Sequence, residues 1–147
     1  MTLTFEDETT TSAPVEDVWK LLYDPARFPD WWQGIESVEP QAHEGRGDYT
    51  MYPDGYPDFP MPQQLRQDTS GRRVTISCLV SDLVFAWRLD PLPGTDGTRI
   101  SVHVELPDQE ARRLEGQREV VSASLRALAA LAHGDAGSAT AGPRARG

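Results

Sequence analysis

The sequence predicts an α+β fold, in which a curved antiparallel sheet of about seven strands wraps around a long C-terminal helix and two short helices follow the first strand. Two observations support this. The apolar residues repeat with a helical period near the start, alternate through the middle, and return to a helical period after residue 107. Short turn signals separate the alternating runs, which is typical of an antiparallel meander. Such a sheet leaves space against its helix for a hydrophobic guest.

The first strand and helix are predicted at the N-terminus. Residues 2–11 alternate and are rich in threonine, which favours a strand. Ser12 has the residue type of a helix N-cap, and Pro14 suits the first helical turn. The apolar residues that follow lie at helical spacing and predict one buried stripe. They are Val15, Val18, Trp19 and Leu22.

A second short helix is predicted to begin at Asp24-Pro25 and to stop at Gly34. Phe28 and Trp32 are four residues apart and therefore share a face. Trp31 and Trp32 point about 100° apart around a helix axis, so one narrow face cannot bury both. We expect Trp31 to be the one near an opening or the surface.

The middle of the chain predicts an antiparallel meander of six further strands. They are expected over residues 35–42, 48–52, 63–68, 74–80, 83–89 and 99–105. The proline-rich segment 53–62 is expected to stay outside the sheet as a loop. Its Tyr56, Phe59 and Met61 make it either a lid over a cavity or an ordinary satellite cluster that covers a strand edge.

A long amphipathic helix is predicted after Pro107-Asp108. Its expected buried side consists of Ala111, Leu114, Val121, Leu125, Leu128 and Ala132. Gly116 interrupts it and predicts a bend or a close approach to the sheet. Residues 1–133 are therefore expected to form a single domain, and residues 134–147, which are poor in large apolar side chains, a disordered tail.

Composition limits the class of function. A net charge of −9 without a basic stripe argues against nucleic-acid binding. No apolar run is long enough for a membrane span, and the N-terminus lacks the pattern of a secretory signal, so a cytoplasmic protein is expected. The single cysteine, Cys78, is expected to be a buried and inert thiol.

The usual signatures of catalysis and of metal binding are missing. His43, His103 and His133 lie far apart, without a ligand at metal-binding spacing, so neither a metal nor a cofactor is expected. His103 alternates with Val102 and Val104, and this places it on the outer face of the sheet. No residue is assigned a catalytic role.

Five residues are the candidates for a ligand-binding surface between the sheet and the long helix. Phe85 and Trp87 share one face of their predicted strand, and Arg88 lies on the other. Tyr49 and Met51 share a face on another strand, where the Tyr49 hydroxyl can orient a polar group of a guest. Trp32 completes the set at the helical end. Core packing without ligand contact remains an alternative for Trp87.

Two segments of the chain resemble a known family. The opening runs Ala13-Pro14-Val15-Glu16-Asp17-Val18-Trp19, with Phe28-Pro29-Asp30-Trp31-Trp32 after it. The ending has Gly97-Thr98 before the last strand and Ser124-Leu125-Arg126-Ala127-Leu128-Ala129 in the helix. Over roughly residues 3 to 132 the chain is similar to the START-like superfamily, the SRPBCC-type proteins that include polyketide cyclase/dehydrases and lipid-transport proteins. The resemblance implies a helix-grip fold with a deep cavity, and it implies no shared catalytic motif.

Three functions remain open at this point. The first is binding of a small hydrophobic molecule, aromatic, polyketide-like or lipid-like, by a cyclase/dehydrase-like protein that works without a metal and by proximity. The second is a passive carrier or sensor without turnover. The third is a module that binds a protein partner through its acidic surface or proline-rich loop, and a homodimer is also left open.

The assignment of a tail yields a first prediction. Deleting residues 135–147 should change the free energy of unfolding by no more than about 0.5 kcal/mol, because the removed residues bury little apolar surface. Thermal unfolding of the two chain lengths, side by side, checks it. A large loss of stability in the shorter chain would show that this segment packs on the domain.

Overall fold

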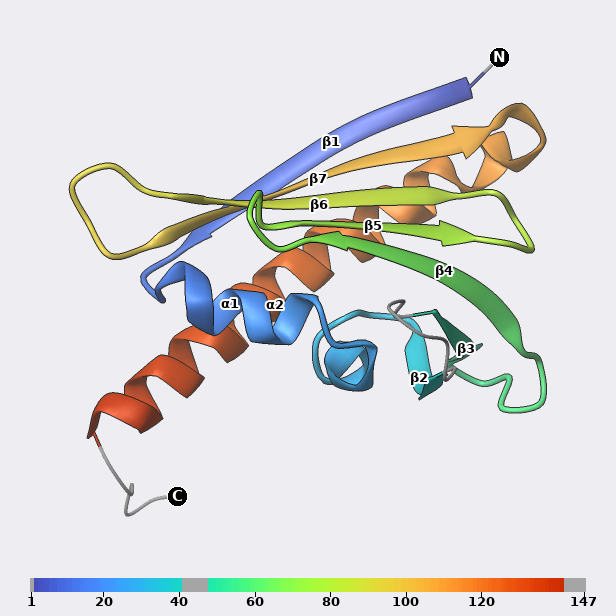
Figure 1. Ribbon diagram of the computed structural model, residues 1–147. Coiled ribbons are helices and arrows are strands. Elements are labelled where there is room, and N and C mark those ends of the chain that lie inside the picture. Colours follow the sequence, from blue (N-terminus) through green and yellow to red (C-terminus); the bar gives the residue numbers. More distant parts are fainter. Residues whose placement is uncertain (1, 41–47, 142–147) are drawn as a thin grey trace.

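The computed structural model describes residues 2–40 and 48–141, with side chains as far as Gly134. The chain forms one seven-stranded antiparallel sheet with helices on one of its faces (Figure 1). The strands are β1 (Thr2–Thr11), β2 (Ile35–Pro40), β3 (Tyr49–Pro53), β4 (Met61–Asp68), β5 (Arg73–Cys78), β6 (Val84–Pro91) and β7 (Thr98–Pro107). The helices are α1 (Val15–Leu22), η1 (Pro25–Asp30), η2 (Asp108–Arg113) and α2 (Leu114–Ala141). This is the helix-grip architecture expected from the sequence.

The sheet order is β1-β7-β6-β5-β4-β3-β2, so the first strand closes the meander by pairing with the last. The β1–β7 ladder pairs every residue from Thr2 to Thr11. At the other end, β4 bends and carries β3 and β2 toward η1 (Figure 1). The described ladder between β3 and β4 contains only three residue pairs, one of which is Thr50 with Pro62. The sheet is therefore joined least firmly at this seam.

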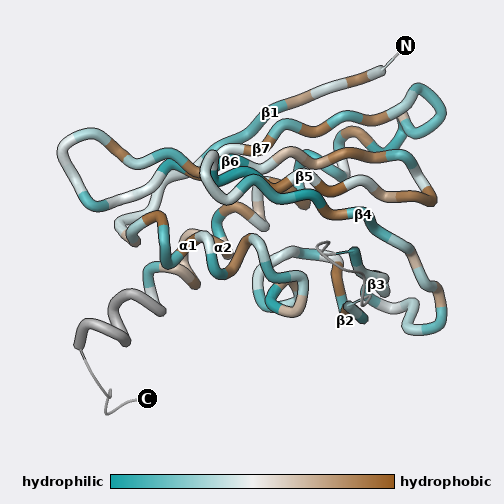
Figure 2. The backbone as a smooth tube through the Cα atoms, in the orientation of Figure 1, coloured by the Kyte–Doolittle hydropathy of each residue, from teal (hydrophilic) through white to brown (hydrophobic). Residues whose placement is uncertain are grey.

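Burial alternates along the strands as the period-two pattern requires. In β7 every second residue, from Thr98 to Leu106, is buried, and the residues between them are partly exposed. Brown and teal segments alternate in the same way along β6 and β7 in Figure 2. One face of the sheet thus packs against the helices, and the other faces solvent.

The N-terminal helices differ in detail from the sequence-based prediction. Pro14 is the N-cap of α1 and makes no capping side-chain hydrogen bond, so the assignment of Ser12 as the cap was wrong. The Ser12 hydroxyl instead lies 2.7 Å from Nδ1 of His133, near the far end of the chain. The second helix is a 3-10 helix, whose first turn is capped by the Asp24 carboxylate accepting from the amide of Ala26 at 3.1 Å.

The expectation that Trp31 lies near the surface was also wrong. Trp31 is fully buried, and its indole N–H donates to the Leu21 carbonyl at 3.0 Å. The 3-10 helix ends at Asp30, and the backbone of Trp31 leaves the helical region with φ −139°. The 100° spacing therefore no longer applies, and the indoles of Trp31 and Trp32 stack with their centroids 5.4 Å apart.

The C-terminal helix begins with a 3-10 segment, a common helix start. Gly116 consequently lies in the first turn of α2, and a Cβ there would meet no atom within 4 Å, so it does not mark a close approach. Ala111, expected on the buried side, is exposed in η2. The helix extends to Ala141, past the expected boundary at Gly134; the tail stays a prediction. No described helix is long and apolar enough to cross a membrane.

The structure differs from the prediction, or does not cover it fully, in the strand expected over residues 35–42 and in the loop expected over residues 53–62. The strand expected over 35–42 is described only to Pro40, and the rest of that range lies outside the described residues. The segment 53–62 is not wholly outside the sheet. Pro53 is the last residue of β3, and Pro62 belongs to β4, where it pairs with Thr50 of β3. Pro62 points its side chain to solvent there.

Gly97 provides a test of how tightly the start of β7 fits against β1. An added Cβ would lie 2.5 Å from the Thr11 carbonyl oxygen. Gly97→Ala should therefore lower the free energy of unfolding by about 1–3 kcal/mol, because the backbone must shift to accept the methyl group. Denaturant unfolding measures the change.

Gly116→Ala is the matched control. It adds the same methyl group in open space within a helix, and it should raise stability by up to about 1 kcal/mol. Equal effects from the two substitutions would contradict the close packing of Gly97.

Candidate functional site

A cavity of about 160 Å³ lies between the inner face of the sheet and the C-terminal helix. Strands β3 to β6 form its floor, the turn after η1 forms one side, and η2 with the start of α2 forms another. Its lining includes Trp32, Tyr49, Met51, Gln63, Cys78, Phe85, Arg113 and Gln117. The cavity is therefore mostly apolar, with a small number of polar groups, as ligand sites usually are.

Trp32 is the centre of an aromatic cluster that bounds the cavity. Its ring contacts Phe28 at 5.3 Å, Phe85 at 5.1 Å and Trp87 at 5.3 Å between centroids. The contacts with Phe85 and Trp87 are close to perpendicular, which is a favourable geometry for aromatic pairs. Trp32 and Phe85 line the cavity, and Phe28 and Trp87 stand against them from the core.

Trp87 is buried and is not among the residues that line this cavity. It contacts Trp31 and Trp32 edge to face. Within the described part of the chain, its Nε1 is the one buried side-chain polar atom that lacks a hydrogen-bond partner. Contact between Trp87 and a ligand stays a prediction, and it would require Trp32 to move.

Three polar side chains form a row across the floor of the cavity. Tyr49 on β3 pairs directly with Gln63 on β4, and Gln63 pairs directly with Cys78 on β5. All three are buried and line the cavity. The Gln63 amide donates to the Met61 carbonyl at 3.2 Å, which holds its side chain in the row.

Burial raises the pKa of the Tyr49 phenol well above its ordinary value of 10.0, and the neighbouring Cys78 raises it further. Desolvation disfavours the phenolate because the charge would lie in apolar surroundings. The ring is held edge to face against Phe28 at 5.5 Å. Tyr49 therefore offers a neutral hydroxyl in a fixed orientation.

The rim of the cavity combines one cation with exposed apolar residues. Arg113 lines it from η2 and donates to the Glu110 carboxylate at 3.0 Å. Leu79 and Val80 are exposed in the β5–β6 turn, between the lining residues Cys78 and Ser81. Leu79 and Val80 themselves are not among the lining residues.

One buried hydroxyl connects α2 to the turn that carries Trp32. Ser124 donates to the Val120 carbonyl at 2.7 Å, and it accepts from the backbone amide of Gln33 at 2.9 Å. Gln33 and Val120 both line the cavity. The hydroxyl therefore fixes two sides of the site relative to each other.

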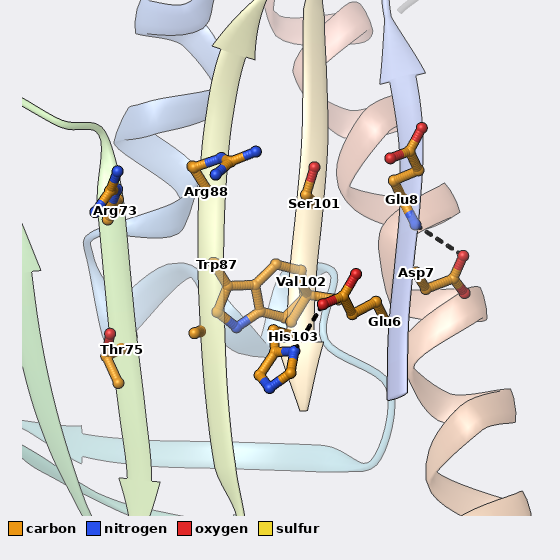
Figure 3. Close-up of a pocket in the computed structure, with 11 residues that line it drawn as sticks. Glu6, Asp7, Glu8, Arg73, Thr75, Trp87, Arg88, Ser101, Val102 and His103 are labelled. Atoms are coloured by element: carbon orange, nitrogen blue, oxygen red, sulfur yellow. Dashed lines mark hydrogen bonds and ion pairs between the residues drawn. The ribbon is translucent and has the colours of Figure 1, made fainter. Parts of the chain in front are cut away.

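A larger hollow of about 640 Å³ lies on the opposite, outer face of the sheet (Figure 3). It is open and polar, and two of its charged or titratable side chains are paired: Arg88 donates to Asp90 at 2.9 Å, and His103 lies 2.9 Å from Glu6. His103 is thus on the outer face, as predicted from its alternation. The inner cavity is better suited to a hydrophobic guest because Trp32 and Phe85 form part of its wall and its lining is mostly apolar.

The structure brings together four of the five predicted site residues. Trp32, Tyr49, Met51 and Phe85 line one cavity. Sequence reasoning missed Gln63 and the cavity-facing position of Cys78, although burial of the thiol was expected and is seen. The alternation within β4 would have placed Gln63 beside Leu65 on the inner face, but a polar side chain gave no reason to select it.

The proline-rich loop does not cover the cavity. Tyr56 and Phe59 are 64% and 51% exposed, so neither a lid nor a packed satellite cluster describes them. Of the three apolar residues named for this segment, Met61, at the start of β4, lines the cavity, as does Pro53 at the end of β3. Among the described residues, no group of three or more His, Cys, Asp or Glu side chains could hold a metal ion, and His43 lies outside those residues.

Solved structures show where this architecture recurs. The ZhuI aromatase/cyclase from Streptomyces sp. R1128 matches 98% of this chain and 100% of its own, with a TM-score of 0.79 and 18% identity. The di-domain aromatase/cyclase BexL from the BE-7585A biosynthetic pathway matches 86% of this chain and 45% of its own, with a TM-score of 0.73 and 15% identity. Truncated norcoclaurine synthase from Thalictrum flavum matches 89% and 93%, with a TM-score of 0.67 and 18% identity.

At these identities the likeness establishes the fold and leaves the activity open. No curated protein sequence matches this chain. The model of the family described as polyketide cyclase / dehydrase and lipid transport matches residues 2–133, which is nearly the whole described domain. A match of that extent, on a helix-grip fold with an internal cavity, shows that the chain belongs to this START-like family.

Proposed function

We propose that this protein binds a small hydrophobic molecule, aromatic or polyketide-like, in the cavity between its sheet and α2. The observation that carries the proposal is the cavity itself, which is walled by Trp32 and Phe85 and carries a short polar row on its floor. Similarity to an aromatase/cyclase and to norcoclaurine synthase supports ligands that contain aromatic rings. Trp32, Tyr49, Met51, Phe85 and Trp87 are the proposed ligand-binding residues.

The lining favours orientation of a ligand over proton abstraction. The described residues that line the cavity include no carboxylate and no imidazole. The Tyr49 phenol, whose pKa is raised by burial, is a poor base near neutral pH. A cyclase built on this site would act by holding a flexible chain in a reactive conformation and by excluding water.

The same observation supports the second candidate, a carrier or sensor without turnover. The described lining can bind and orient a ligand, and it contains no evident acid–base pair. A carrier or sensor requires no further groups. The partner-binding alternative has less support, because the space between the sheet and α2 contains a cavity and is not filled by side chains.

Ligand binding is tested by tryptophan emission. A hydrophobic aromatic ligand should change the emission of the wild-type protein, and Trp32→Phe should remove most of that change because Trp32 lines the cavity. Trp19→Phe is the matched control, since Trp19 is buried in α1 and does not line the cavity. Equal loss of response in both variants would contradict the proposed site.

Turnover separates the two candidate functions. The protein is incubated with an aromatic polyketide precursor, and bound ligand and cyclised product are followed together. Product in excess of protein, lost in Tyr49→Phe while binding persists, would make the protein a cyclase. Stoichiometric binding without product supports the carrier.

The raised pKa of Tyr49 predicts a pH dependence of stability. The unfolded chain loses the phenolic proton near pH 10, and the folded protein retains it to a higher pH. The free energy of unfolding should therefore fall as pH rises above about 10, by up to about 1.4 kcal/mol per pH unit from this group. Tyr49→Phe should flatten this fall.

Denaturant unfolding between about pH 8 and pH 11 measures the slope. Tyr56→Phe serves as the control, because Tyr56 is exposed on the β3–β4 loop. Identical alkaline slopes for wild type and Tyr49→Phe would contradict the burial of a protonated phenol.

A further inference from the structure

We propose that the row of Tyr49, Gln63 and Cys78 recognises a neutral carbonyl oxygen carried on an aromatic ring. This inference rests on the proposed function and names the chemistry of its ligand. The three residues come from neighbouring strands and are directly paired in register. Their side chains therefore lie side by side on one surface, and that surface is part of the cavity floor.

The row presents hydrogen-bond donors whose capacity is not used within the protein. Among the described residues, the Tyr49 side chain makes a ring contact with Phe28, and no hydrogen bond of its hydroxyl is formed. Gln63 uses one of its two amide hydrogens on the Met61 carbonyl, which leaves the other. Cys78 adds a weak S–H donor. Among the described residues Trp87 Nε1 is the one buried side-chain polar atom without a partner, so the free donors of the row are accessible from the cavity, and a ligand acceptor that reaches them forms a hydrogen bond there.

The charge of the row selects against anions. Tyr49, Gln63 and Cys78 carry no positive charge, and transfer of a carboxylate to an uncharged buried site is unfavourable. The cation among the described lining residues is Arg113, which belongs to η2 and not to the floor. It is already paired with Glu110, and its side chain is 40% exposed.

The dimensions of the cavity point to a single ring at the floor. A volume of about 160 Å³ is close to the roughly 150 Å³ of an apolar cavity that holds benzene. Trp32 and Phe85 line the same space, and they stand edge to face to each other. A ring packed against them can place a carbonyl substituent at the polar row, while any longer part of the ligand leaves by the rim.

The test compares three ligands of similar size: ethylbenzene, acetophenone and benzoate. Ethylbenzene has the ring and no oxygen, acetophenone adds a neutral carbonyl, and benzoate adds a charge. Dissociation constants are measured by protein-observed NMR titration on wild type, Tyr49→Phe and Gln63→Leu. We expect each substitution to raise the dissociation constant of acetophenone by about threefold to tenfold, as loss of a hydrogen bond does. The dissociation constant of ethylbenzene should stay within about twofold of the wild-type value.

Tyr52→Phe is the matched control on the same strand. The Tyr52 hydroxyl donates to Glu39 at 2.8 Å and is not part of the cavity lining, so this variant should bind all three ligands as wild type does. The amide spectrum of each variant, recorded before titration, shows that the fold is retained.

Each other outcome overturns the inference in a recognisable way. Equal weakening of ethylbenzene and acetophenone would mean that the row acts by packing alone. Binding of benzoate as tight as that of acetophenone would mean that the Arg113 cation, and not the row, recognises the ligand oxygen. Failure of all three ligands to bind the wild-type protein would contradict the proposed function itself. Binding that is unaffected by Tyr49→Phe and Gln63→Leu would leave the proposed function intact and contradict only the assignment of the row as a carbonyl-binding site.

Discussion

The position of α2 relative to the sheet is the constraint on which the site depends. Two hydroxyl groups set it. Ser124 joins the helix to the backbone of Gln33, and Thr11, at the end of β1, donates to the Ala129 carbonyl at 3.1 Å. The Ser124 hydroxyl satisfies the backbone amide of Gln33, and the Thr11 hydroxyl adds a hydrogen bond to a carbonyl within α2. The helix is thereby fixed at two points along its length, and the cavity has a defined width.

The aromatic cluster then decides how much of that space remains. Phe28, Trp31 and Trp87 fill the part of the interior next to α1 and β6, and Trp32 separates them from the cavity. A helix-grip domain with smaller side chains at these positions would contain a longer cavity. Here about 160 Å³ is left, and under the proposed function selectivity would come from a few polar groups instead of from depth.

Alternation along the strands is the reason that much of the site was predictable from the sequence. A period of two fixes the face of every residue once one face is buried, so Tyr49, Met51 and Phe85 fell on the inner face and His103 on the outer face as expected. The family resemblance implied a helix-grip order of elements, and the structure confirms it. The alternation is read within one strand at a time, and the resemblance is read over most of the chain, so neither inference requires knowledge of which strands pair.

The failures have a different origin. Trp31 turned inward because the 3-10 helix ends one residue before it, and the end of such a helix is not marked by residue type. Ser12 was drawn away from the helix by His133, which is 121 residues distant. The row of Tyr49, Gln63 and Cys78 depends on the registers of two ladders, and register across strands cannot be read from any one of them.

The short ladder between β3 and β4 has a consequence for how a guest enters. Pro62 has no amide hydrogen to donate, and part of the missing pairing is supplied by a side chain, since the Asp48 carboxylate accepts from the Leu65 amide at 3.0 Å. Local opening requires the least free energy where the fewest backbone hydrogen bonds must break. Tyr49 and Met51 lie on one side of this seam and Gln63 on the other. The described ladder with the fewest residue pairs therefore runs through the floor of the cavity. If the proposed guest enters by local opening of the sheet, this seam is therefore where the fewest ladder hydrogen bonds would have to break.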